Sequence, residues 1–347
     1  MAMKAWQVDS LGEPDGVMTL RDLSTPEPGA DQILVRVLAS AANFPDVLMC
    51  RGEYQVKPPL PFTPGVELCG EVVALGSQIG EQHSIGARVL GGSTLQRGGV
   101  NGGFAQYALM PATEAVAAPA ELDDAEATSL WIGYQSAWFG LHRRAQLQAG
   151  ETLLVHAAAG GVGSAAVQLG KAAGARVIAV VGGPDKGRVA TELGADLVID
   201  RHQSDFVAEV NDVTEGLGAD VIFDPVGGET YGRSTKCVAF EGRIVVVGFA
   251  GGSIQSAPLN HALVKNYSIV GLHWGLYHRR NLAAVIECHA ELCRLVSTGL
   301  VRPLVSERLP LTALADGLQR LSAGTTVGRV VYDASIDLPQ DLPGDPT

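Results

Sequence analysis

The chain has 347 residues, of which 46% are hydrophobic and 18% are charged, and it contains 43 glycines. At roughly 150 residues per domain this length predicts about two domains, each long enough to bury a core. The formal net charge of −12 disfavours partners that are themselves anionic, so we expect binding neither to nucleic acid nor to a membrane.

The start of the chain and its cysteines favour a cytoplasmic protein. Residues 1–10 lack the long apolar run of a signal peptide, and no stretch of about 18 apolar residues is free of charges and turn signals. The histidines show no HxH or HExxH spacing, so we expect no bound metal. Five scattered cysteines without a disulfide framework indicate reduced thiols: Cys50, Cys69, Cys237, Cys288 and Cys293.

The first 130 residues have the texture of an irregular β-domain. Residues 33–38 alternate and are rich in branched side chains, which predicts a strand. Proline and glycine then interrupt the chain repeatedly, in residues 58–65, 91–92 and 98–103.

From Asp123 onward the pattern changes to helices alternating with short apolar strands. Strands that are apolar on both faces are typical of a parallel sheet covered by helices on each side, so the pattern predicts a doubly wound α/β domain. A long helix, a closing strand and a tail after Asp333 that we expect to fray complete the chain. The predicted helices are 123–145, 164–173 and 281–298, and the predicted strands are 152–156, 176–181, 197–200, 220–223, 243–248, 267–271 and 327–332.

A glycine-rich turn at residues 157–163 joins the first of these strands to a helix. Ala158 takes the first position of a GxGxxG pattern, where a small residue permits a tight turn. Gly160 lets the backbone approach a pyrophosphate, and Gly163 lets helix and strand pack closely. The helix start, with Gly161 and Val162, offers free N–H groups. The turn therefore predicts a dinucleotide site.

The end of the next strand favours NADPH over NADH. A site for NADH usually has an acidic residue there to hold the ribose 2′-hydroxyl, but this chain has Gly182 followed by Gly183. Lys186 and Arg201 can supply cations for a 2′-phosphate. The alternative for each is a solvated surface charge; we favour the phosphate contact for Lys186, and for Arg201 both alternatives stay open. Asp185 lies close in sequence, and its carboxylate would repel a 2′-phosphate, which counts against NADPH.

Further motifs recur in order along nearly the whole chain. They are residues 43–46 (Asn-Phe-Pro-Asp), 51–54 (Arg-Gly-Glu-Tyr), 64–72, 86–89, 103–107, 157–163, 224–228, 248–250 and 258–260. Together they resemble the zinc-independent quinone oxidoreductases of the medium-chain dehydrogenase/reductase superfamily. The resemblance implies a mainly β, GroES-like catalytic domain (residues 1–130 and 275–347) around a Rossmann domain for NADPH (residues 131–274). It also implies a homodimer or a tetramer joined through the edges of the Rossmann sheets, and of these we expect the homodimer.

The same resemblance implies chemistry without zinc. The positions that hold catalytic zinc in related alcohol dehydrogenases correspond here to Asn43, Val66 and Ile132, none of which is a usual transition-metal ligand. Pro45 takes the place of the proton-relay hydroxyl. A quinone accepts hydride without a Lewis acid, and a conjugated carbonyl accepts it at the β-carbon, so the protein mainly has to orient two rings.

The resemblance also assigns site residues. Asn43 and Ser136 are expected near the nicotinamide and the substrate, and Tyr54 either lines the pocket as packing or donates its phenol. Asp46 is expected to hold its loop together. Further residues that contact the cofactor, or merely pack or lie at the surface, are Gly248, Phe249, Ala250, Trp274 and Arg329.

Three functions are compatible with these residues. The first is NADPH:quinone oxidoreductase. The second is reduction of α,β-unsaturated carbonyls or enoyl thioesters, for which basic residues would be useful if the substrate carried coenzyme A; the candidates are Arg97, Arg143, Arg144, Arg279 and Arg280. The third is a non-catalytic NADPH-binding protein, which would bind the cofactor without turnover.

Overall fold

The computed structural model describes residues 2–337, which form two compact units. One unit contains residues 2–131 together with residues 305–337, and the other contains residues 132–304. The return to the first unit thus begins 30 residues later than the predicted 275. The reason is that Arg302 remains attached to the second unit: its N–H donates to Gln168 at 2.8 Å, and its carbonyl accepts from Tyr134 at 3.1 Å.

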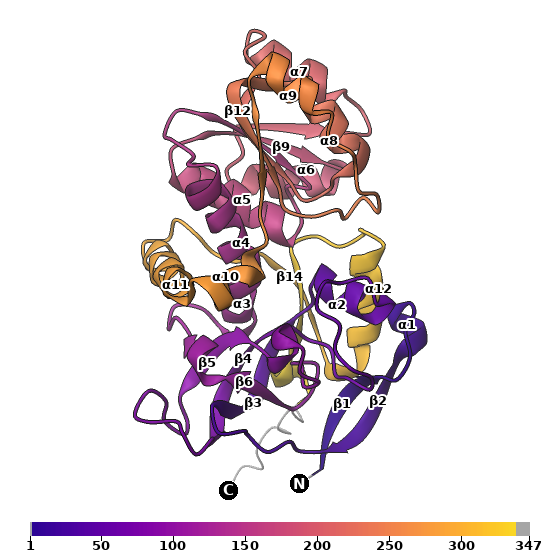
Figure 1. The fold of residues 1–347 in the computed structure, drawn as a ribbon, viewed down its shortest axis with the longest axis vertical. Helices are drawn as coiled ribbons and strands as arrows, with labels where there is room; N and C mark the ends of the chain where they lie inside the picture. The colour runs from indigo at the N-terminus through magenta and orange to yellow at the C-terminus, as the bar shows by residue number, and fades with distance from the viewer. Residues whose placement is uncertain (1, 338–347) are drawn as a thin grey trace, which may run out of the picture. The chain divides into compact units, whose positions relative to one another are not determined.

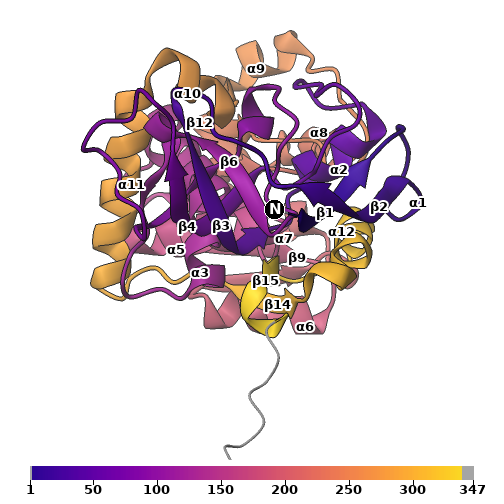
Figure 2. The same cartoon turned by 90° about the horizontal axis from the view of Figure 1, so that it is seen from below.

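The first unit is built on a mixed sheet with the order β14-β15-β3-β4-β5-β7, in which β6 also pairs with β3. Figure 2 shows β3, β4 and β6 side by side. The strands are β1 (Ala2–Val8), β2 (Met18–Ser24), β3 (Gln32–Ala41), β4 (Glu67–Leu75), β5 (Arg88–Gly92), β6 (Tyr107–Pro111), β7 (Val116–Ala117), β14 (Val305–Leu309) and β15 (Arg329–Asp333). The helices are α1 (Pro14–Val17), α2 (Phe44–Arg51), α3 (Asp124–Ser129) and α12 (Leu314–Ser322).

The second unit contains a parallel sheet with the order β10-β9-β8-β11-β12-β13. Figure 1 labels two of its strands, β9 and β12. The strand order reverses at β8, so the carboxyl ends of β8, β9 and β11 flank a topological switch point, where such sheets bind ligands. This confirms the predicted doubly wound fold. The strands are β8 (Thr152–His156), β9 (Arg176–Val181), β10 (Leu197–Asp200), β11 (Ala219–Asp224), β12 (Val238–Val246) and β13 (Ser268–Gly271).

Helices join these strands as the alternating pattern predicts. They are α4 (Gln135–Trp138), α5 (Gly161–Ala172), α6 (Pro184–Glu192), α7 (Phe206–Val213), α8 (Gly228–Ser234), α9 (Leu259–Lys265), α10 (Tyr277–Arg280) and α11 (Leu282–Ser297). The predicted helix 123–145 is helical from 124 to 144, with wider π-type turns at Leu130–Tyr134 and Phe139–Arg144. The predicted tail after Asp333 falls mostly outside the described residues.

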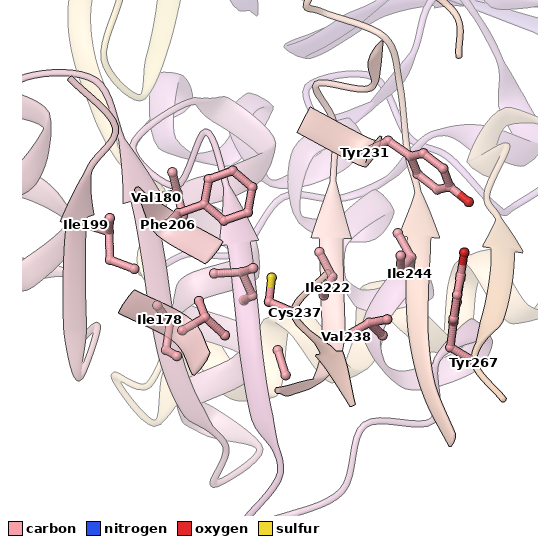
Figure 3. Packing of buried hydrophobic residues seen from close by; sticks show 13 residues of the cluster. Ile178, Val180, Ile199, Phe206, Ile222, Tyr231, Cys237, Val238, Ile244 and Tyr267 are labelled. Carbon is pink, nitrogen blue, oxygen red and sulfur yellow. The ribbon is translucent and has the colours of Figure 1, made fainter. Parts of the chain in front are cut away.

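The core of the second unit lies beneath the strand ends that matter for the site. Branched side chains from neighbouring strands pack with the aromatic rings of Phe206, Tyr231 and Tyr267, and Figure 3 shows the two tyrosine hydroxyls directed toward each other. Helix α5 packs closely on β8, because a Cβ on Gly170 would lie 2.5 Å from a methyl of Leu153. This contact fixes the carboxyl-terminal part of α5 against the sheet.

Within residues 2–337, no helix has both the length and the apolar character needed to cross a membrane.

Candidate functional site

The turn between β8 and α5 has the geometry of a dinucleotide cradle. Helix α5 begins at Gly161, three residues earlier than predicted, and Gly160 caps it without any side chain over its end. The first N–H groups of a helix have no partner inside it, and the helix dipole adds a partial positive charge. Gly160, Gly161 and Val162 are only partly buried, so these groups are accessible to an anion.

Gly163 is required by the close approach of α5 to the end of β8. A Cβ at this position would lie 2.7 Å from the carbonyl carbon of Ala157 and 2.9 Å from the Cα of Ala158. Ala158 is fully buried, and its N–H donates to the carbonyl of Val180 on β9 at 3.1 Å. The turn is thus held in shape by backbone contacts, which fit a cofactor whose pyrophosphate approaches the chain.

Cations gather beside Gly182, where a carboxylate would stand in a site for NADH. A Cβ on Gly182 would lie 3.1 Å from Nε of Arg201, so the guanidinium lies directly over this glycine. Burial lowers the pKa of Lys186, and the charge of Arg201 lowers it further, which places the two cations within electrostatic reach of each other. Asp185 is exposed and pairs with Arg188 at 3.1 Å, so its charge is compensated on the surface of α6.

The carboxylate of Asp200, at the end of β10, shapes the same region. It accepts the N–H of Gly183 at 2.9 Å and that of His202 at 3.0 Å, and these bonds lower its pKa. Asp200 therefore fixes the loop that carries Gly183 relative to the loop that carries Arg201. No motif in the sequence marks Asp200 as a site residue, because it stands simply as the last residue of a strand.

The loops after β11 and β12 form the next part of the sheet's carboxyl edge. Asp224 is buried and accepts the N–H groups of Val226 and Gly227 at 2.8 and 2.9 Å. The ring of Phe249 lies against Gly227, where a Cβ would come within 2.7 Å of it, and Phe249 remains 37% exposed. The N–H of Ala250 donates to the carbonyl of Pro225, so residues 248–250 are anchored to the loop after β11. A cofactor contact for these residues stays a prediction.

Trp274 contacts Gln135, the residue that precedes Ser136 in α4. The indole N–H of Trp274 donates to Oε1 of Gln135 at 3.2 Å, and its ring meets the edge of His278. Trp274 is 6% exposed and Ser136 is 8% exposed. This environment favours packing as the role of Trp274, while a cofactor contact for either residue stays a prediction.

The first unit contains a buried polar network around Asn43. Nδ2 of Asn43 donates to Oε1 of Glu67 at 2.8 Å and to the carbonyl of Ala41 at 3.0 Å. Oδ1 of Asn43 accepts from Nη1 of Arg329 at 3.0 Å, and Arg329 also forms an ion pair with Glu67. Because carboxylate and carbonyl oxygens only accept, the amide has one possible orientation.

Arg329 lies in the interior, with 5% of its surface exposed. The alternative of a surface location is therefore wrong. Burial lowers its pKa to about 10, which still leaves the guanidinium charged at neutral pH. Its charge is balanced by Glu67, which is fully buried. A cofactor contact for Arg329 stays a prediction.

Asp46 holds the loop around Asn43 to the start of β4. Its carboxylate accepts the N–H of Asn43 at 3.0 Å, that of Gly65 at 2.9 Å and that of Val66 at 3.1 Å. Burial raises the pKa of Asp46 to about 7, against the effect of these three donors and of Arg329. The structural role expected for Asp46 matches this geometry.

Tyr54 follows α2 and is partly buried. Burial and the charge of Asp46 raise the pKa of its phenol, so Tyr54 stays protonated at neutral pH and can donate a hydrogen bond. The phenol is therefore within electrostatic reach of the Asn43 loop.

These residues do not fit a catalytic zinc ion. Oδ1 of Asn43, the amide atom that could coordinate a metal, accepts from Nη1 of Arg329, whose positive charge would repel a second cation. The side chain of Val66 is aliphatic and 1% exposed, and it cannot coordinate a metal. Within residues 2–337, no three His, Cys, Asp or Glu side chains group as a metal site would require.

Comparison with known proteins identifies the family. Residues 29–120 match the alcohol dehydrogenase GroES-like domain, and residues 161–291 match the zinc-binding dehydrogenase family. A quinone oxidoreductase-like protein 2 homolog of Nematostella vectensis is 37% identical, over 95% of this chain and 88% of its own length. The chain belongs to the quinone oxidoreductases of the medium-chain dehydrogenase/reductase superfamily.

Solved structures of this family agree over the whole fold. A probable oxidoreductase from Mycobacterium abscessus has a TM-score of 0.85 at 35% identity, covering 96% of this chain and 99% of that one. The quinone oxidoreductase of Escherichia coli, determined in complex with NADPH, has a TM-score of 0.86 at 26% identity, covering 95% of this chain and 99% of that one. This quinone oxidoreductase family member is thus an oxidoreductase with a GroES-like and a Rossmann unit.

Proposed function

We propose that this protein transfers hydride from NADPH to a quinone without a metal ion. The choice of NADPH rests on the two cations beside Gly182, Arg201 and Lys186. A 2′-phosphate needs positive charge at this position, whereas the 2′-hydroxyl of NADH needs a carboxylate. Two further features support a dinucleotide: the open start of α5 and the backbone approach at Gly163. The NADPH complex of the Escherichia coli relative agrees with this assignment.

When bound, NADPH supplies the hydride, and the chain's own residues supply position and hydrogen bonds. The start of α5 holds the pyrophosphate, and Arg201 and Lys186 hold the 2′-phosphate. Phe249 supplies an apolar surface beside the switch point. Since a quinone is already electron-poor, orientation of the two rings provides most of the acceleration.

The network around Asn43 limits what this residue can do. Both its N–H groups are occupied, so the position left on the amide is the second lone pair of Oδ1. Asn43 therefore accepts a hydrogen bond, for example from a carboxamide, and does not donate one to a developing oxyanion. That donor is Tyr54, whose phenol stays protonated, or water.

The test follows the oxidation of NADPH, and separately of NADH, with para-benzoquinone, phenanthrenequinone and a short enone, with and without a chelator. Rapid chelator-resistant oxidation of NADPH by quinones is the expected result. Turnover only with the enone would move the function to reduction of conjugated double bonds. Tight NADPH binding without turnover of any acceptor would favour the non-catalytic binding protein.

We also propose that the protein is a homodimer. Strand β13 is the last strand of the parallel sheet, and the nearby helix α9 exposes Leu259, Leu263 and Val264, each more than 70% accessible. Exposed apolar side chains beside a sheet edge are typical of an interface. Light scattering after size exclusion should give twice the chain mass, and Leu263→Glu should shift it toward the monomer.

A further inference from the structure

Four arginines lie in one region of the second unit, and we call Arg143, Arg144, Arg279 and Arg280 the arginine patch. Arg143 and Arg144 end the helical run that contains α4, and Arg279 and Arg280 end α10. Figure 1 labels both helices, α4 and α10. All four side chains are exposed. Arg97, which was grouped with them on the basis of sequence, belongs to the other unit and forms an ion pair with the buried Glu114.

Aromatic contacts hold the two chain segments together. The ring of Tyr277 lies 4.3 Å from that of Phe139, measured between centroids, and the guanidinium of Arg143 lies over the same tyrosine ring at 5.8 Å. Nε of Arg144 donates to the carbonyl of Gly271 at 3.1 Å. Arg279 is close enough to His273 to lower the pKa of that imidazole, in addition to the effect of burial.

The arginine patch has no acidic partner among the described residues. Elsewhere in the second unit, Arg188, Arg233, Arg243 and Arg294 each pair with a carboxylate within about 3.1 Å. Glu291, the acid that acts on His142 beside the patch, is itself paired with Arg294. Four uncompensated cations on a chain with a net charge of −12 call for an external anion.

Helix dipoles do not account for this charge. The carboxyl end of a helix has about half a negative charge, so two such ends balance roughly one of the four guanidiniums. Guanidinium groups bind phosphate oxygens through paired N–H donors, and several of them fit a group with adjacent phosphates. We propose that the arginine patch binds the pyrophosphate group of a nucleotide-linked small molecule. This inference does not rest on the proposed quinone reduction.

The test is a calorimetric titration. The protein solution contains a slight molar excess of NADPH throughout, so that the Rossmann site is already filled when the probe is added. The probes are inorganic pyrophosphate, ADP and coenzyme A. We expect binding of pyrophosphate, weakened roughly ten-fold in Arg143→Ala and more in Arg279→Ala/Arg280→Ala. Added salt should weaken it further, because the patch is exposed. The matched control is Arg176→Ala. Arg176 is exposed at the start of β9, donates to the carbonyl of Val213 and forms no ion pair within 4 Å among residues 2–337.

Each result bears directly on the proposal. Tighter binding of coenzyme A than of ADP would support the patch and assign it to a thioester ligand, whereas equal binding would support it and assign it to free nucleotides. Absence of binding, or equal binding by the wild type and the arginine variants, would overturn it. Binding of heparin or RNA without binding of any of the three probes would also overturn it. NADPH affinity of each variant shows that the second unit is folded.

Discussion

Nη1 of Arg329 donates a 3.0 Å hydrogen bond to Oδ1 of Asn43, joining two residues 286 positions apart in sequence. Glu67 closes the group by accepting from Asn43 and pairing with Arg329. A buried ion pair is costly to form because both charges lose their hydration. Substituting only one of its two residues costs still more, because the remaining buried charge then has no partner. The network therefore holds Asn43 in a single orientation.

Glu67→Gln should destabilise the protein by about 3–5 kcal/mol, because it leaves the buried guanidinium of Arg329 uncompensated. Urea unfolding measures this free energy. The matched control is Glu71→Gln on the same strand, β4, where Glu71 pairs with Arg36 at the surface. That variant should lose no more than about 1 kcal/mol. Equal losses in the two variants would show that the buried pair does not hold the site.

The sequence predicts the second unit well, because its signals are local. Apolar runs such as 176–181 fix the strands, and the glycines of residues 157–163 need particular backbone geometry that is visible in the sequence. The network in the first unit has no such local signal. Glu67 and Arg329 each stand in a strand, where a charged side chain normally points to solvent, and only the pairing of β15 with β3 and of β3 with β4 brings them together.

The boundary near residue 305 was missed for a similar reason. Gly299, in a left-handed conformation, and Pro303 mark the end of α11. They do not indicate to which unit the following segment is attached, because this depends on hydrogen bonds of Arg302 with Tyr134 and Gln168. The grouping of Arg143 with Arg279 likewise depends on contacts of the Tyr277 ring with Phe139 and Arg143. Contacts between residues that are distant in sequence leave no periodic pattern.

Gly163→Ala should lower stability by about 1–3 kcal/mol and weaken NADPH binding, because the new Cβ meets backbone atoms of Ala157 and Ala158 that cannot rotate away. Gly232→Ala, in α8, is the control, since a Cβ there has no heavy atom within 4 Å. It should stabilise the protein by about 0.4–1 kcal/mol through the entropy of the unfolded chain. Thermal unfolding with and without NADPH distinguishes the two; similar behaviour would refute the close approach.

Gly182→Asp should change cofactor preference toward NADH, because its carboxylate repels a 2′-phosphate and can accept from a 2′-hydroxyl. Arg201→Ala and Lys186→Ala should each raise the KM for NADPH by roughly 10- to 100-fold and leave that for NADH nearly unchanged. Arg188→Ala is the control, because Arg188 pairs with Asp185 on the surface of α6. An equal rise in KM for both cofactors would contradict a phosphate contact.

Asp46 should make stability fall as pH rises from about 4 to 7. Its carboxyl group has an ordinary pKa of 3.8 when unfolded, and burial raises the pKa in the folded chain to about 7. The folded state thus binds the proton more tightly, and this contribution, present below pH 3.8, is lost as pH rises through 7. The difference of about three units between the pKa values of Asp46 in the unfolded and folded chain corresponds to about 4 kcal/mol of unfolding free energy.

Other carboxyl groups act in the opposite sense and have to be subtracted. Hydrogen bonds hold the pKa of Asp200 and that of Asp205 below the usual range. The contribution of these two groups to the unfolding free energy therefore decreases as pH falls. The measured quantity is therefore the difference in unfolding free energy between the wild type and Asp46→Asn. Asparagine also loses the bond from the N–H of Asn43, but that loss is independent of pH. A difference that is flat between pH 4 and 8 would disprove the raised pKa.

Cys293 should be the thiol that quinones modify in the folded protein. Burial raises the pKa of Cys50 and of Cys237 to about 12, and it raises that of Cys69 and of Cys288 as well, so these four thiols stay protonated and shielded. Cys293 is partly exposed, and its Sγ lies 3.4 Å from Nε2 of His289 on the preceding turn of α11. The imidazole can take the thiol proton as sulfur attacks a quinone carbon.

Intact mass after brief exposure to para-benzoquinone should show one adduct on the wild type and none on Cys293→Ser. His289→Gln should slow the addition several-fold, since it removes the base that accepts the proton. Cys288→Ser, five residues earlier on α11 and fully buried, should react as the wild type does. An adduct that persists in Cys293→Ser would locate the reactive thiol elsewhere. The quinone that forms this adduct is also the proposed substrate. Quinone assays with Cys293→Ser should therefore keep a constant rate for longer than assays with the wild type.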